Sequence, residues 1–433
     1  MNTIIFRLKD AIHRNAPSLF RLLKTIKHGL CPSQPVASCG QPQPLFSEIS
    51  VASGFVPKIR LLKSSTRPKA VLVLPHLRPE GFSGGPNTAL FFAAEIAGKG
   101  YDVLCLAAEY PVCSPERLRQ HLMDALGLAP DVAGKFQTAG IRETIPLHPG
   151  DTFIATHYKT VEIVEKFQEQ SGGKAFLYLI QDFEPMFHPW DENHATAITT
   201  YEKNFLPVVN EALLADFMCN MRVGRFSEEV FRRTVLTFSP AVDRRHFYPE
   251  KKEQKTHVLL FYARPDNPRN LFEFGMQALS LLAWEGVLVP EKWKIWCMGT
   301  PSVPPYDLGN GIRTQTLPWM GFSDYAACLR QASAGLSLML SPHTSYIPLE
   351  LAACNIPVVT TTYVNKTAEA LQAISPWIHA ASPAPKDIAA ALKQVVQMAE
   401  NGTVAENRPF LFPDTWKDAF APIMPNVLDH MEK

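Results

Sequence analysis

The sequence has no large excess of charge of either sign, no clustered cysteines and no long apolar run. Its 42 Lys and Arg residues oppose 41 Asp and Glu, a net charge of +1, which argues against nucleic acid as a partner of the whole protein. The eight cysteines are scattered, with neither a Cys-x-x-Cys motif nor a Cys/His cluster at zinc spacing, so we expect a reduced, cytoplasmic chain. No apolar run approaches the roughly 18–20 uncharged residues that span a bilayer.

The positive charge is concentrated at the N-terminus. Residues 1–30 carry six basic side chains against Asp10 alone, interleaved with apolar residues at the spacing of basic amphipathic helices. Two interpretations stay open: a peripheral contact with an anionic membrane on its inner face, or a helix packed on the protein's own body. Residues 31–65 are rich in Pro and Ser and predict an irregular linker. Residues 1–65 therefore form a segment distinct from the folded body.

Short apolar runs alternate with helix-length segments from Lys69 onward, which is typical of a parallel sheet covered on both faces. In a first series the expected strands are Ala70–Leu74, Tyr101–Ala107, Thr152–Ala155, Ala175–Ile180 and Asp216–Asn220. A second series gives His257–Ala263, Trp293–Met298, Gly335–Leu340 and Pro357–Thr360. Between the two series, residues 239–254 contain two prolines and seven charged residues, which predicts a domain boundary.

The predicted fold class is therefore α/β, with two doubly wound, Rossmann-like parallel-sheet domains facing a cleft. We expect them over residues 66–245 and 246–410, with an amphipathic tail over 411–433. In such folds ligands bind outside the carboxyl ends of the strands. The functional residues should therefore lie in the loops that follow strands.

The strongest local signal lies in residues 341–359. A strand runs into a loop of small polar residues, a helix begins near Ser345 and Tyr346, and Glu350 lies about one turn inside it. Backbone N–H groups at such a helix start can bind a diphosphate. Glu350 could accept hydrogen bonds from the hydroxyls of a nucleotide's sugar; alternatively, it is an ordinary first-turn glutamate that favours the helix dipole.

This segment resembles the second domain of GT-B glycosyltransferases of the family 4 type, in which a glutamate, an alanine-rich helix and a Pro-Val-Val strand follow one another. Residues 261–270 resemble the Gly-Arg…Lys motif of that family, with Arg264 at the arginine and Arg269 at the lysine. The resemblance implies that these two cations bind the donor diphosphate. Two departures are Pro342, where the family has a first glutamate, and Ala263 in place of glycine.

Gln-Asp-Phe-Glu-Pro at residues 181–185, followed by Thr200-Tyr201, resembles the rhamnosyltransferase group of WsaF, over about residues 70–425. This implies transfer of a deoxyhexose, L-rhamnose from dTDP-L-rhamnose, to a growing bacterial-type surface glycan, with retention and without a metal or cofactor. The implied partners are a nucleotide sugar and an oligosaccharide or lipid-linked glycan acceptor. The fold also implies that the tail over 411–433 crosses back to the first domain.

Five residues of the first domain are candidates for the same site. Gly84 and Gly85 precede a helix and permit close approach of the backbone to a ligand. His157 is the second residue after an expected strand, where many relatives place a histidine near the transferred sugar. Asp182 and Glu184, two residues apart on an expected extended segment, should point the same way. One of them could orient an acceptor hydroxyl or take its proton, or else cap the following segment.

Leu317 and Trp319 lie in a loop that borders the nucleotide base in GT-B folds. Trp319 either stacks on the base or belongs to the core. Two other functions stay open: a nucleotide-sugar epimerase or hydrolase with the same fold, and a non-catalytic nucleotide-sugar or glycan-binding subunit of a glycan-assembly complex.

Overall fold

The computed structural model describes residues 55–63, 67–79, 82, 84–250, 256–300, 303–402, 410 and 412–433. The basic N-terminal segment, on which the membrane hypothesis depends, and most of the Pro-rich linker lie outside these residues. None of the helices within the described ranges combines the length and the apolar character needed to cross a membrane.

The first sheet is built from short apolar runs of the N-terminal half of the chain. Its seven strands pair in parallel in the order β4-β3-β2-β6-β7-β8-β9. They are β2 (Ala70–Leu74), β3 (Val103–Ala107), β4 (Phe136–Gly140), β6 (Thr152–Ala155), β7 (Phe176–Ile180), β8 (Phe205–Asn210) and β9 (Leu236–Phe238). The order reverses between β2 and β6, the switch point where ligands bind in doubly wound sheets.

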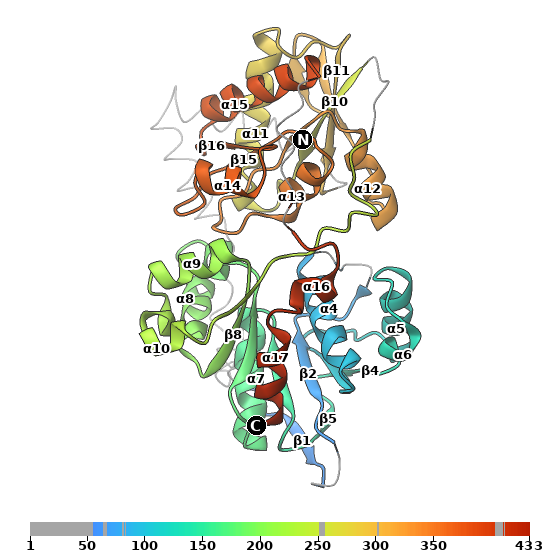
Figure 1. Cartoon of the computed structure of the whole chain (residues 1–433), viewed down its shortest axis with the longest axis vertical. Coiled ribbons are helices and arrows are strands. Elements are labelled where there is room, and N and C mark those ends of the chain that lie inside the picture. Colours follow the sequence, from blue (N-terminus) through green and yellow to red (C-terminus); the bar gives the residue numbers. More distant parts are fainter. Residues whose placement is uncertain are drawn as a thin grey trace, which may run out of the picture. The chain divides into compact units, whose positions relative to one another are not determined.

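Helices connect these strands and cover both faces of the sheet. They are α4 (Gly84–Gly98), α5 (Pro115–Asp124), α6 (Pro130–Ala133), α7 (Tyr158–Ser171), α8 (Glu192–Thr199), α9 (Ala212–Asn220) and α10 (Glu229–Arg232), with 3-10 helices η2 (Glu184–Phe187), η3 (Thr200–Glu202) and η4 (Gly224–Ser227). Helices α5 and α6 lie at one edge of the sheet, and α8, α9 and α10 gather at the other (Figure 1). We call this sheet and its helices the first lobe.

The second lobe repeats this architecture with its own sheet, ordered β12-β13-β11-β10-β14-β15-β16, in which only β12 runs antiparallel to its neighbour. Its strands are β10 (His257–Tyr262), β11 (Trp293–Met298), β12 (Asp307–Gly309), β13 (Ile312–Thr316), β14 (Ala334–Leu336), β15 (Val358–Thr361) and β16 (Ile378–Ala381). Its helices are η5 (Pro268–Asn270), α11 (Phe272–Trp284), α12 (Phe322–Gln331), α13 (Tyr346–Ala353), α14 (Ala368–Ile374) and α15 (Pro385–Glu400).

Each sheet has an apolar core on both of its faces, because neighbouring side chains of a strand point to opposite faces. In β2, Leu72 and Leu74 belong to one buried cluster and Val71 and Val73 to the cluster on the other face. Burial of each such side chain stabilises the fold by about 1.5–3 kcal/mol. This two-sided burial explains why the strands are continuous apolar runs rather than alternating ones.

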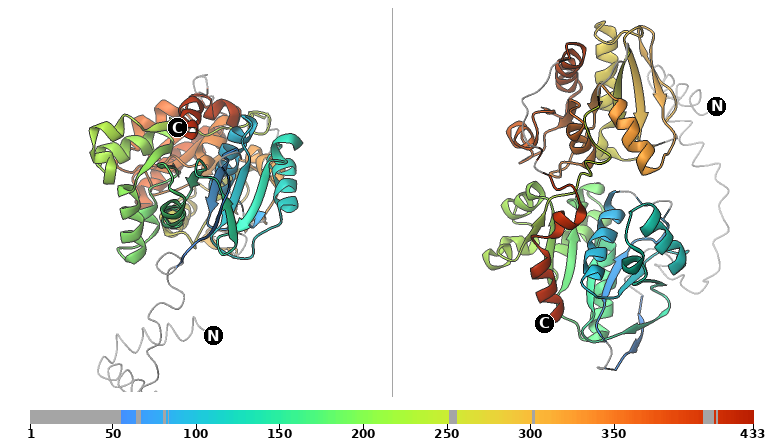
Figure 2. Two further views of the ribbon diagram at one scale, coloured as in Figure 1. Left: turned by 90° about the horizontal axis from the view of Figure 1, so that it is seen from below. Right: turned by 45° about the vertical axis from the view of Figure 1, so that its right-hand side comes forward.

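The last two helices, α16 (Trp416–Phe420) and α17 (Met424–Glu432), pack on the first lobe although they follow the second in the chain. Phe420 is fully buried, with its ring centroid 5.3 Å from that of Phe92 in α4 and 4.8 Å from that of Phe238 in β9. Both views in Figure 2 and the view in Figure 1 show these red helices beside the first sheet. The C-terminal residues therefore complete the core of the first lobe.

Two local predictions are wrong. The strand expected at Asp216–Asn220 is the second half of α9, and the strand of this region is β8, a run of apolar residues that contains Pro207. Proline cannot donate to a sheet ladder, so it argues against a central strand, yet β8 pairs with both β7 and β9. The Pro-rich linker is also not irregular throughout, since β1 (Lys58–Leu61) pairs in parallel with β5 (Thr144–Leu147).

Candidate functional site

Polar side chains at the carboxyl ends of both sheets contact one another. Asp182, which follows β7, forms an ion pair with Arg269 of η5 and accepts a hydrogen bond from the hydroxyl of Ser341, which follows β14. The N–H of Phe183 also donates to Asp182 Oδ1 at 2.9 Å. Burial raises the pKa of Asp182, but Arg269, His343 and these hydrogen bonds outweigh that effect and the net pKa is lowered. Asp182 is therefore an ionised carboxylate bound to the second lobe.

A second group of contacts surrounds Tyr346, the first residue of α13. Its hydroxyl accepts a hydrogen bond from Asn210 Nδ2 at 2.8 Å and lies 2.9 Å from the hydroxyl of Thr88 in α4. A Cβ at Gly84 would lie 2.8 Å from the Tyr346 ring, so this position has room only for glycine. The group that approaches the backbone at Gly84 is thus the ring of Tyr346. Gly85 belongs to the same first turn of α4, and its carbonyl accepts a hydrogen bond from the Gln181 side chain at 3.0 Å.

The loop before α13 has an unusual backbone. Ser345 has a φ of 74°, in the left-handed region that side-chain-bearing residues rarely adopt. Its N–H donates to His343 Nδ1 at 2.9 Å, and the N–H of Thr344 donates to Glu211 Oε1 at 2.7 Å. Backbone held in this region clusters at ligand sites, where the surrounding structure enforces it.

The two arginines lie on the loop that follows β10. Arg264 is half-buried, and its Cγ would lie 3.1 Å from a Cβ at Gly299, which has a φ of 108°. Arg269 places its guanidinium 4.1 Å from the ring centroid of Phe187 in addition to its ion pair with Asp182. Both arginines therefore lie in the segment between β10 and α11, and Arg269 contacts Asp182 and Phe187 of the first lobe.

The residues proposed to bind the nucleoside lie around α12 and α13. Glu350 is the fifth residue of α13, beyond the first turn, and accepts a hydrogen bond from the Tyr325 hydroxyl of α12. Burial raises the pKa of Glu350 to about 7, and that hydrogen bond opposes the rise. Leu317 directly follows β13, with its N–H bonded to Cys297 O at 2.8 Å. Trp319 is 61% exposed, so the alternative of a core tryptophan is wrong and its ring is accessible to a ligand.

The buried Glu184 and the partly buried His157 lie close together at the start of α7. Glu184 Oε2 accepts hydrogen bonds from the N–H of Tyr158 at 2.6 Å and the hydroxyl of Tyr178 at 3.1 Å. Burial raises the pKa of Glu184 to about 8 and lowers the pKa of His157 to about 3. With His157 Nε2 3.9 Å from Glu184 Oε1, the two groups meet near neutral pH as a neutral imidazole and a protonated carboxyl.

The expectation that Asp182 and Glu184 point the same way is therefore wrong. Asp182 contacts the second lobe, whereas Glu184 caps α7 inside the first lobe. The physical reason is local: the chain is not extended there, because the 3-10 helix η2 begins at Glu184. The alternative that Glu184 caps the segment that follows it is also wrong, because the helix that it caps precedes it in the sequence.

Glu184→Gln should make stability less dependent on pH. Because the pKa of Glu184 in the folded protein lies above the glutamate value of 4.5, the folded state binds more protons than the unfolded chain between pH 4.5 and about 8. Its contribution is present below that range and lost as pH rises through about 8, an effect of about 2–4 kcal/mol. Urea unfolding at pH 6 and pH 9 should show a larger loss for the wild type than for Glu184→Gln. The exposed Glu192→Gln is the matched control and should behave as the wild type.

Sequence reasoning missed Lys366, which lies in the loop after β15. Its side chain is fully buried, and Nζ donates to Met339 O at 2.9 Å and His343 O at 3.3 Å. Burial lowers the pKa of Lys366 to about 7, although Asp182 and Glu211 oppose this. The available signal was its position in a loop that follows a strand of the second sheet, which is where ligands bind in such folds.

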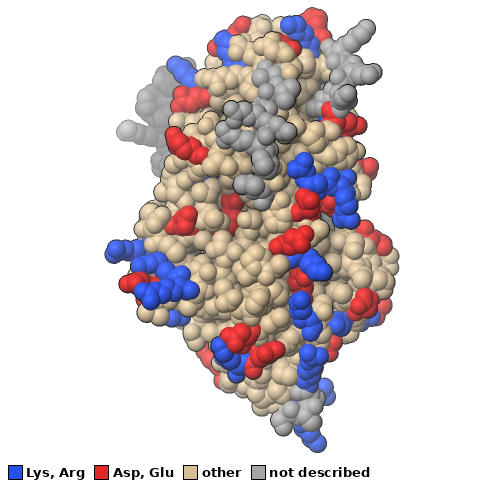
Figure 3. All heavy atoms as spheres, in the orientation of Figure 1, with Lys and Arg blue, Asp and Glu red and all other residues tan. Residues whose placement is uncertain are grey.

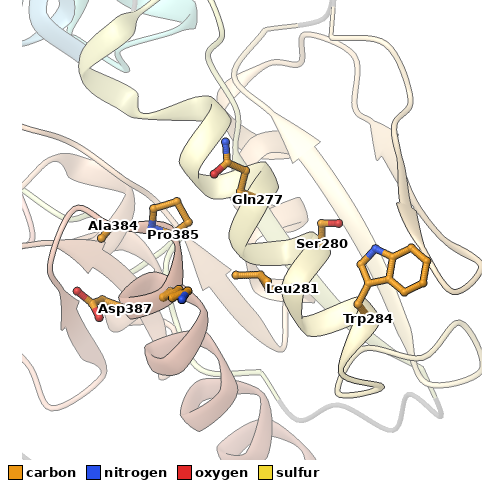
Figure 4. A pocket seen from close by; sticks show the side chains of 8 residues that line it. Gln277, Ser280, Leu281, Trp284, Ala384, Pro385 and Asp387 are labelled. Carbon is orange, nitrogen blue, oxygen red and sulfur yellow. The ribbon is translucent and has the colours of Figure 1, made fainter.

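Other features of the surface do not coincide with this cluster. A hollow of about 720 Å³ lies between α11 and the start of α15, and none of the predicted site residues lines it (Figure 4). On the face shown in Figure 3, basic and acidic side chains are interspersed. Among the described residues, no group of three or more His, Cys, Asp or Glu side chains is arranged to hold a metal ion.

Comparison with known proteins gives matches over both lobes. Residues 69–211 match the N-terminal domain of WsaF, and residues 257–393 match its C-terminal domain. The chain is 32% identical over 236 residues to the O-antigen biosynthesis protein RfbC of Myxococcus xanthus, a match that covers 53% of this chain and 17% of RfbC. The chain thus spans about a sixth of the length of this curated relative.

Two solved structures share the arrangement of both lobes. Sucrose-phosphate synthase from Thermosynechococcus elongatus aligns with a TM-score of 0.57 at 13% identity, covering 84% of this chain and 99% of that one. HepE from Anabaena, in complex with UDP-glucose, aligns with a TM-score of 0.54 at 12% identity, covering 84% of this chain and 100% of that one. At these identities the likeness shows the fold alone, and it confirms the predicted GT-B fold.

Proposed function

Because the chain belongs to the WsaF family of glycosyltransferases, we propose that it transfers a deoxyhexose, L-rhamnose from dTDP-L-rhamnose, to a growing surface glycan with retention. The observation that carries this proposal is the cluster at the strand ends. There, Arg269 and Ser341 of the second lobe contact the ionised carboxylate of Asp182 in the first lobe. Arg264 lies five residues before Arg269, and Ser341 lies in the loop that leads to α13. The name of RfbC supports O-antigen or a related glycan as the acceptor class.

The second lobe has the chemistry to bind a nucleotide sugar. Guanidinium groups bind phosphate oxygens bidentately, so Arg264 and Arg269 would neutralise the charge that develops on the leaving diphosphate. The start of α13 near Ser345 and Tyr346 would add its dipole. Glu350 would accept a hydrogen bond from a hydroxyl of the nucleotide's sugar, and the exposed ring of Trp319 would stack on the base. The structure of HepE, which has the same fold, holds UDP-glucose and supports this class of donor.

The first lobe supplies the acceptor side of the reaction. Asp182 is ionised and has a lowered pKa, so it would orient an acceptor hydroxyl more effectively than it would remove a proton. Glu184 carries a proton near neutral pH and His157 is neutral, so they would shape the site without adding charge. In the retaining route with attack on the same face as departure, the leaving phosphate takes the acceptor proton. No strong base is then required.

The first test is thermal stabilisation by a panel of nucleotides and nucleotide sugars. A ligand that binds the folded state at about 100 times its dissociation constant adds about 2.7 kcal/mol of stability. We expect dTDP and dTDP-rhamnose to raise the unfolding temperature of the wild type and to lose this effect in Glu350→Ala. Glu369→Ala, which removes an exposed first-turn glutamate of α14, is the control and should retain it.

The same panel separates the alternatives. A shift with UDP- or GDP-sugars instead would keep the nucleotide-sugar enzyme and discard rhamnose. Absence of any shift would favour the non-catalytic subunit, for which Pro342 in place of the family's first glutamate is the specific observation. Turnover that depends on the acceptor then distinguishes a transferase from a hydrolase.

A further inference from the structure

An anion-binding position of the second lobe is filled by a side chain of the first. The carboxylate of Asp182 receives the guanidinium of Arg269 on one oxygen and the hydroxyl of Ser341 on the other. Ser341 is held in turn, since its Oγ accepts the N–H of His343 at 3.1 Å. Asp182 is 8% exposed, so these protein groups take the place of water around its charge. The result is a binding site for one small anion, formed by two separate loops of the second lobe.

The same groups suit a phosphate. A carboxylate and a phosphate both present oxygen acceptors with negative charge, and arginine and hydroxyl donors bind either one. The buried Lys366 donates from Nζ to the carbonyl of His343, in the same loop as Ser341, at 3.3 Å. A diphosphate bound to Arg269 would lie next to the Asp182 carboxylate, which also binds this guanidinium. The two groups carry like charge and repel each other, so they compete for Arg269.

We propose that Asp182 is an internal occupant of the diphosphate site: it holds Arg269 in the unliganded protein and is displaced when the donor binds. This inference rests on the proposed function, since it takes Arg269 as a ligand of the donor. Displacement frees the Asp182 carboxylate once the donor is bound. The carboxylate can then accept a hydrogen bond from the hydroxyl of the glycan acceptor. Donor binding and acceptor binding are thereby ordered by one exchange of partners.

The exchange predicts that removal of the Asp182 charge strengthens binding of the diphosphate. In Asp182→Asn, the amide keeps a similar shape but no longer competes as an anion, and the dissociation constant of dTDP should fall about tenfold. Thymidine, which lacks the diphosphate, should bind the variant and the wild type equally. Isothermal titration of the full-length protein measures both ligands; UDP and uridine replace them if the nucleotide panel selects uridine.

Glu211→Gln is the matched control. Glu211 also joins the lobes, through the N–H and hydroxyl of Thr344, but it makes no bond to Arg269. If Glu211→Gln strengthens dTDP binding as much as Asp182→Asn does, the gain comes from the removal of any nearby negative charge. That result overturns the proposal. If thymidine binding tightens in parallel, the cause is separation of the lobes, which overturns it equally.

The outcomes also separate this inference from the function on which it rests. A wild type that binds dTDP, with no gain in Asp182→Asn, contradicts the exchange and leaves the donor site intact. A wild type that binds no nucleoside diphosphate contradicts both. A gain confined to the diphosphate and to Asp182→Asn supports both.

Discussion

Arg264→Ala should lower transfer of the sugar by about 10²–10³-fold while the protein stays folded. The reason is that a guanidinium next to the leaving diphosphate donates hydrogen bonds to the oxygens on which negative charge develops in the transition state. Arg264 is the better of the two arginines for this test. Loss of Arg269 would also leave the buried charge of Asp182 without its partner, which destabilises the fold by itself.

The measurement is the initial rate of acceptor-dependent transfer, together with the unfolding temperature of each variant. Arg313→Ala is the control: this arginine of β13 has a side chain that is 76% exposed and pairs with Asp307 at 3.7 Å. It should keep its activity and stability. Parallel losses of activity and stability in Arg264→Ala would assign Arg264 a structural role instead of a role at the diphosphate.

Phe420→Ala should destabilise the protein by about 3–5 kcal/mol, because it leaves a large cavity in the core of the first lobe. Its fully buried ring contacts those of Phe92, Phe238 and Trp416, the last at a centroid distance of 5.5 Å. Urea unfolding followed by tryptophan fluorescence measures the loss. A free energy of unfolding equal to that of the wild type would mean that the C-terminal helices contribute little to this core.

Trp190→Ala is the control for this substitution. The Trp190 side chain is larger than that of Phe420, but it is 94% exposed. Folding therefore buries little of its apolar area. The free energy of unfolding should change by less than about 0.5 kcal/mol. The contrast tests burial rather than the mere loss of an aromatic side chain.

The fold was predictable where the strands are uninterrupted apolar runs. The bounds of β2 and β11 agree with the expected ones, because both strands lie inside the sheet and carry a clear local pattern. Pro207 concealed β8, and β1 could not be inferred from its neighbours because its partner β5 lies more than 80 residues later. Pairing between distant segments leaves no trace in a local window.

The candidate site was predictable in its position and not in its contacts. Asp182 was predicted from its place after a strand and Arg269 from the resemblance of its motif, but their ion pair joins residues 87 positions apart. The direction of Glu184 depended on the unforeseen turn at η2. Lys366 was overlooked because a lysine after a strand is ordinarily solvated, and only tertiary packing shows that this one is buried.

The return of α16 and α17 to the first lobe has a consequence for how the protein can be divided. Among the described elements, the chain passes from one lobe to the other twice, once between β9 and β10 and again between α15 and α16. A single break near residue 245 would therefore separate Phe420 from the core that it fills. A gene fragment that encodes the first lobe by itself must join two distant stretches of coding sequence. Exchange of the second lobe between homologues by recombination requires two crossovers.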